Sequence, residues 1–236
     1  MNVKFIWEHN GSDTLLLSAS HPGAFTRGSN LDAAQRKMRQ EINSYYRWQV
    51  KTPPDDLEFE ICQEKVSNLN IRDADSDVLF EDEIQPLTMT EYTQLKELAL
   101  KSAQDFQVLY DAIPDKDESC LPHRSTFYGP VPRTAWEMYV HTKSVNAYYF
   151  AEIDVEADNE GTILSCRERG FEKLEKIPGF LANPVISGSY GEDWNLRKVL
   201  RRFIWHDRIH AKAMYRMAVK TFGSVVVPDI FHFDAV

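Results

Sequence analysis

The sequence has few cysteines and no long hydrophobic run. Its three cysteines, Cys62, Cys120 and Cys166, lie far apart and form no CxxC pair, which argues against a disulfide framework and a zinc ribbon. The longest apolar runs are far shorter than the roughly 20 residues that cross a bilayer, so we expect no membrane partner. Near the N-terminus, Glu8 and His9 stand where a signal peptide would continue its apolar core, and this predicts a cytoplasmic protein.

Basic residues are in the minority. The 236 residues include 27 lysines and arginines against 36 aspartates and glutamates, which gives a formal net charge of −9. This balance disfavours a nucleic-acid partner, because binding to phosphates needs a basic surface. With 43% hydrophobic residues, a chain of this length can bury the core of one large or two small domains.

Residues 1–72 predict a small α+β domain. Several stretches have the length and composition of strands, namely residues 3–7, 14–18, 23–27 and 57–66. Between the third and fourth stretches, Ser29 or Asn30 caps a helix that ends near Trp48. The predicted order of elements is therefore β-β-β-α-β.

The same segment resembles the small HicB-like domain, which has this order of elements. The resemblance is carried by the entry into the helix, residues 25–34 (FTRGSNLDAA). Members of that family are antitoxins or partner-binding modules, so the resemblance implies a partner-binding role for residues 1–72.

An acidic linker at residues 73–86 separates this domain from a helical one. The pattern of residues 87–236 predicts an all-α four-helix bundle, with the capping box of Thr88 and Glu91 opening its first helix. The expected helices and the hydrophobic tail that follows them are residues 88–113, 134–153, 165–176, 193–221 and 225–233. The predicted fold class is thus an α+β domain followed by an all-α four-helix bundle.

Histidines occupy positions in this helical part where apolar residues are expected. His141 falls on the apolar face of its helix, and His206 and His210 are four residues apart on the last helix. Side chains at that spacing have Cβ atoms roughly 5–6 Å apart, so both imidazoles can reach one metal ion. A lone inward histidine is more often a hydrogen-bonded core residue, but three together predict an open, Lewis-acid metal site.

Two carboxylates are candidate catalytic or supporting residues. Glu137 lies one turn before His141 and could act as a fourth ligand or a general base. Asp207 falls on the inward side of the last helix and could orient a ligand imidazole. The alternatives are a solvated or interhelical carboxylate for Glu137 and an ion-pair partner of an arginine for Asp207.

Three segments resemble the DinB-like superfamily of metal-binding, thiol-transferase-like helical proteins: residues 133–141 (RTAWEMYVH), 192–200 (EDWNLRKVL) and 205–210 (WHDRIH). In that family one histidine comes from the second helix and two come from an H-x-x-x-H motif on the last. His141, His206 and His210 match these positions. The resemblance covers about residues 87–236.

This resemblance implies a nickel or zinc ion and a chain that can form a homodimer. Characterised members use the metal to lower the pKa of a low-molecular-weight thiol, which is then moved onto a substrate. We therefore expect a metal-dependent transferase or hydrolase that acts on a small-molecule substrate. The alternative is a non-enzymatic partner-binding or regulatory protein in which a metal stabilises the helices.

Overall fold

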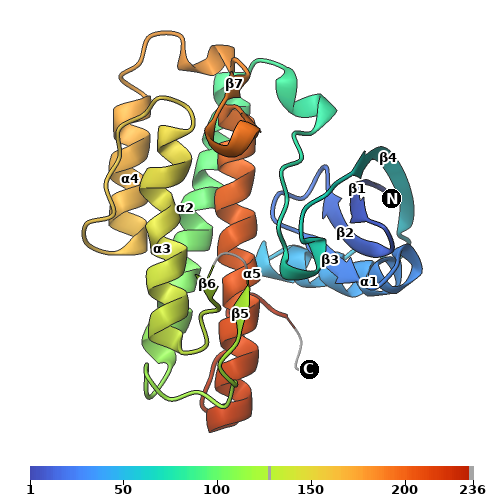
Figure 1. Ribbon diagram of the computed structural model, residues 1–236, viewed down its shortest axis with the longest axis vertical. Coiled ribbons are helices and arrows are strands. Elements are labelled where there is room, and N and C mark those ends of the chain that lie inside the picture. Colours follow the sequence, from blue (N-terminus) through green and yellow to red (C-terminus); the bar gives the residue numbers. More distant parts are fainter. Residues whose placement is uncertain (127–128, 234–236) are drawn as a thin grey trace.

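A mixed sheet forms the N-terminal part of the molecule and lies beside a set of long helices (Figure 1). The structure is a computed structural model that describes residues 1–126 and 129–233. The sheet has the order β3-β2-β1-β4. Its strands are β1 (Asn2–Asn10), β2 (Asp13–Ser18), β3 (Phe25–Gly28) and β4 (Glu58–Val66). Neighbours β1, β2 and β3 pair antiparallel, whereas β4 pairs parallel with β1.

Helix α1 (Leu31–Trp48) covers one face of this sheet. It begins after Asn30, whose side chain accepts a hydrogen bond from the amide of Ala33. Its apolar residues recur every three to four positions, and Met38 and Ile42 are fully buried against the strands. The chain thus runs β-β-β-α-β through its first 66 residues.

Helices dominate the C-terminal part: α2 (Met89–Ala112), α3 (Ala135–Ala151), α4 (Ile163–Leu174) and α5 (Leu196–Phe222). Threonine capping boxes start α2, α3 and α4, and the Asn195 side chain caps α5. The long helix α5 packs against both α2 and α3. None of the helices among the described residues has the length and apolarity needed to cross a membrane.

The predicted all-α four-helix bundle is wrong for this part of the chain. Short antiparallel strand pairs lie between the helices: β5 (Ser125–Thr126) with β6 (Gly129–Pro130), and β7 (Ile186–Ser187) with β8 (Asp193–Trp194). The last helix also begins at Leu196 rather than at Asp193, because Asp193 and Trp194 pair with β7. A sheet-rich region followed by helices with short strand pairs is the fold observed.

The helices also do not pack only against one another, because α5 packs against the N-terminal part as well. Gly23, before β3, has φ +89° and approaches α5 so closely that an added Cβ would lie 2.5 Å from Ile204 Cγ2. Nearby, the Arg208 guanidinium donates a hydrogen bond to the Gly23 carbonyl oxygen at 3.2 Å. One hydrophobic core accordingly runs from sheet residues such as Phe5 to helix residues such as Phe203.

The acidic segment 73–86 lies against α5. Glu83 is buried and forms an ion pair with Arg201 at 2.5 Å, and Lys198 donates to the carbonyl oxygen of Asp77 at 2.8 Å. These contacts fix the segment on the surface of α5. The division into residues 1–72, a linker and residues 87–236 stays a prediction.

Candidate metal centre

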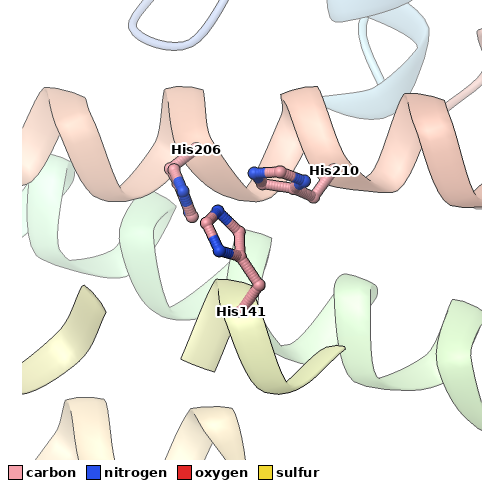
Figure 2. A group of neighbouring side chains, drawn as sticks. All are labelled: His141, His206 and His210. Atoms are coloured by element: carbon pink, nitrogen blue, oxygen red, sulfur yellow. The ribbon is translucent and has the colours of Figure 1, made fainter. Parts of the chain in front are cut away.

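Three imidazoles from two helices converge at the middle of α5. His141 projects from α3 towards His206 and His210 on α5, and Figure 2 shows the rings facing one another. One nitrogen of each ring can be chosen so that all three lie within 4.8 Å of one another. The ring centroids are 4.4 Å apart for His206 and His210, and 4.6 Å apart for His141 and His210.

Local packing fixes the two helices that carry these rings. Helix α3 starts at the capping box of Thr134, two turns before His141. About two turns after His141, the Tyr149 ring meets the His206 ring edge-on at 6.0 Å and also contacts Phe203. Phe203 is fully buried, so this contact anchors the register of α3 against α5. His141 is exposed and the other two histidines are half-buried, which leaves the centre open on one side.

All three histidines favour the neutral form. Although part of its side chain is exposed, partial desolvation by the surrounding protein lowers the pKa of His141. Burial, followed by repulsion from His210 and His141, holds the pKa of His206 well below its ordinary value. The pKa of His210 is lowered to about 3, mainly by burial and then by the charges of His141 and Arg27. At neutral pH each ring therefore keeps a lone pair for a ligand.

The donor set fits a divalent metal ion. Nitrogen–zinc bonds are about 2.0–2.1 Å long, and side-chain rotation can bring nitrogens that lie within 4.8 Å of one another to that distance. Within the described chain, Nδ1 of His206 is buried and has no hydrogen-bond partner. A buried polar atom without a partner is rare in folded proteins, and metal coordination would satisfy it. Imidazole nitrogens suit both zinc and nickel.

Glu137, a sequence candidate for ligand or base, does not join the three histidines. Its carboxylate accepts hydrogen bonds from the amides of Arg133 at 2.7 Å and Thr134 at 3.2 Å. The Arg133 amide is the main cause of its lowered pKa. Glu137 therefore caps the N-terminus of α3, as its place in a capping box dictates.

Asp207 likewise lies apart from the imidazoles. It is fully buried on the side of α5 that faces α2 and α4. Its two oxygens accept hydrogen bonds from the Arg167 guanidinium, and the Ser102 hydroxyl donates to the same carboxylate at 2.5 Å. The alternative interpretation of Asp207, an ion-pair partner of an arginine, describes this contact.

Sequence reasoning missed two arginines near the centre. Arg167 lies in α4 and is fully buried, and its charge acts on His206, yet nothing local distinguishes it from the half-buried Arg169 of the same helix. Arg27 lies at the end of β3, and its charge acts on His210. Only the packing of the sheet on α5 brings Arg27 near the centre, so no helical or strand periodicity in the sequence could have predicted its position.

Comparison with protein-family models, with curated proteins and with solved structures gives no match. The resemblance to the DinB-like superfamily therefore rests on the quoted segments and the histidine positions alone.

Proposed function

We propose that His141, His206 and His210 bind one divalent ion, zinc or nickel, and that the chain is a metal-dependent enzyme of the DinB-like superfamily. The reaction would be a transfer or hydrolysis on a small-molecule substrate, with a low-molecular-weight thiol as cofactor. The observation that carries this proposal is the convergence of three neutral imidazoles within 4.8 Å from two helices far apart in the sequence.

The proposed chemistry follows from the neutral form of the three imidazoles. When bound, the ion would lower the pKa of a thiol or water molecule and so supply a nucleophile near neutral pH. Burial favours the neutral imidazoles of His206 and His210, so that each has a lone pair available for the ion. The exposure of His141 leaves room for a small molecule on that side.

The thiol in this scheme comes from a small molecule. None of the cysteines contributes a ligand atom to the histidine group. Cys166 is buried in α4, where burial raises the pKa of its thiol, and Cys62 lies on β4 of the sheet. Cys120 packs near Thr221 at the far end of α5. An external thiol is therefore the nucleophile that this scheme requires.

The same proposal includes a cytoplasmic location and a chain that can form a homodimer. It includes neither a nucleic-acid partner nor a membrane partner, in keeping with the net charge of −9.

Metal content tests the proposal. Protein purified without a histidine tag should contain about one zinc or nickel ion per chain by inductively coupled plasma mass spectrometry. His206→Ala should lose this metal while its far-UV circular dichroism stays unchanged. His123→Ala is the matched control, because His123 is exposed in a loop outside the group.

A turnover assay distinguishes an enzyme from a non-enzymatic protein in which the metal only stabilises the helices. Consumption of a thiol in the presence of an electrophile should occur with the metal-containing wild type and stop in His206→Ala. Metal content that is unchanged in His206→Ala would overturn the site. Stoichiometric metal without turnover, together with a captured partner protein, would favour the non-enzymatic alternative.

A further inference from the structure

A cavity of about 880 Å³ lies between the sheet-rich part and the helices, and His210 is one of its lining residues. Strand β3 and helix α1 supply one wall, and α5 supplies the opposite wall. Met138, one turn before His141 on α3, also lines it. The cavity therefore adjoins the candidate metal centre from the side of the N-terminal part.

The cavity is basic although the chain is acidic. Six lysine and arginine side chains line it against three carboxylates, whereas the whole chain has a net charge of −9. Some of these charges are already paired. Lys212 donates to the buried carboxylate of Glu41 at 2.6 Å, and Arg124 lies 3.6 Å from Asp73. Arg72 lies 3.9 Å from Asp13, so among the described residues Arg27, Lys37 and Arg216 are the lining cations without an ion pair.

Arg27 and Arg216 are the main unpaired charges. Arg27 is half-buried at the end of β3 and donates to the carbonyl oxygen of Arg72 at 2.9 Å. Within the described parts of the chain, neither Arg27 nor Arg216 forms an ion pair. Burial lowers the pKa of Arg27; the charge of Asp73 offsets part of this effect, and repulsion from Arg124 and Arg216 adds to it. Guanidinium groups held together in this way attract an anion, since a carboxylate or phosphate relieves their repulsion.

The uncharged lining contains both polar side chains, such as Thr14, Gln40 and Ser44, and apolar ones. Phe25 and Ile71 line the cavity from the sheet side, and Ile209 and Phe233 line it from the helix side. A cavity of this size, with a partly apolar lining and a few convergent charges, has the general character of a small-molecule site. Its occupant therefore needs an anionic group and an apolar body.

We propose that this cavity binds a small organic anion, whose carboxylate or phosphate is held by Arg27 and Arg216 and whose apolar body lies along the wall that leads to His210. The anion would be the substrate class of the candidate metal centre, and in this respect the inference rests on the proposed function. Binding of the anion itself needs the arginines and not the metal.

Isothermal titration calorimetry tests this site with defined probes. Phenyl phosphate and benzoate join an apolar ring to a phosphate or a carboxylate, and inorganic phosphate lacks the ring. Each probe is titrated into the full chain, both as purified and after treatment with a chelator. We expect saturable binding of phenyl phosphate or benzoate at one site per chain, tighter than that of inorganic phosphate. The probe that binds tighter identifies the anionic group.

Arginine variants assign the binding to the cavity. Arg27→Gln and Arg216→Gln should each raise the dissociation constant of the tighter-binding probe by about tenfold, because each removes a charge-assisted contact. Arg36→Gln is the matched control, since Arg36 is exposed on α1 outside the cavity and should leave affinity unchanged. Far-UV circular dichroism verifies that every variant is folded.

Three results would overturn the anion site: no saturable binding of either aromatic probe, equal weakening in Arg36→Gln, or unchanged affinity in both cavity variants. Binding that disappears with the chelator but survives in Arg27→Gln and Arg216→Gln would place the anion on the metal and would also overturn it. Failure of the metal proposal has a different signature: the purified protein would contain neither zinc nor nickel, whereas the aromatic probes would still bind and the two cavity variants would still weaken that binding.

Discussion

Arg167 of α4 and Asp207 of α5 form an ion pair from which solvent is fully excluded. Their Nη1 and Oδ2 atoms are 2.5 Å apart, and neither side chain has any exposed surface. Ser102 of α2 donates to the same carboxylate, and Arg167 also donates to the carbonyl oxygen of Ala99. This cluster joins α2, α4 and α5 at the residue that follows His206, so it holds the helix that carries His206 and His210.

Removal of Arg167 should destabilise the fold strongly. Arg167→Met leaves the Asp207 carboxylate buried without its partner, which typically costs about 3–5 kcal/mol in the free energy of unfolding. Urea denaturation followed by circular dichroism measures this loss. The double variant Arg167→Met/Asp207→Leu should recover part of it, because no unpaired charge then remains. A loss below about 1 kcal/mol in Arg167→Met would show that the pair contributes little.

Glu137→Ala should affect the stability of α3 and not the metal. The carboxylate caps the helix through the amides of Arg133 and Thr134, and loss of a cap typically costs about 1 kcal/mol. Thermal unfolding measures this change, and metal content should equal that of the wild type. A variant that unfolds normally but loses the metal would instead make Glu137 a ligand.

Glu8 should make stability depend on pH near neutrality. Burial is the main cause that raises its pKa from 4.5 to about 7, although the Ser76 hydroxyl and the Asp77 amide donate to the carboxylate. The folded state therefore holds this proton more tightly than the unfolded state. The resulting stabilisation is present below pH 4.5 and is lost as pH rises through about 7.

Glu8→Gln removes this titration. Relative to the wild type, the variant should gain on the order of 3 kcal/mol in the free energy of unfolding as the pH rises from about 5 to 8. Urea denaturation across this range provides the measurement. Glu58→Gln, at an exposed position on β4, is the matched control. A stability difference between Glu8→Gln and the wild type that does not change with pH would contradict the raised pKa of Glu8.

Gly23→Ala should loosen the contact between the sheet and α5. The added methyl group would meet Ile204 and the backbone already has a positive φ, so we expect a loss above about 1 kcal/mol. Gly11→Ala is the control, because Gly11 has φ +58° but open space around it. Chemical denaturation compares the two. Equal losses would mean that the backbone angle, and not the contact with α5, sets the requirement for glycine.

Local patterns account for much of the secondary structure and for the faces of the histidines. The capping box of Thr88 and Glu91 begins a helix where its spacing predicts, because a capping box depends on residues only three positions apart. The start of α5 was misplaced, since the pairing of Asp193 with Ser187 is a contact between segments that no helical period reveals. The four-helix bundle was wrong for the same reason.

The site was predictable only in part. Helical periodicity places His206 and His210 on one face of the last helix, where they lie together. It also predicts an inward His141, which instead is exposed beside them. The role of Asp207 depended on Arg167, which comes from another helix. Arg27 comes from the sheet, 183 positions before His210, so its place beside the centre is a consequence of tertiary packing alone.

X-ray absorption spectroscopy at the zinc or nickel edge tests the metal centre most directly. We predict three nitrogen ligands at about 2.0–2.1 Å with the multiple-scattering pattern of imidazole, reduced to two in any variant that retains metal after His206→Ala. A sulfur ligand from the chain, or a spectrum that is identical in the wild type and in His206→Ala, would contradict the assignment of His141, His206 and His210 as the metal ligands.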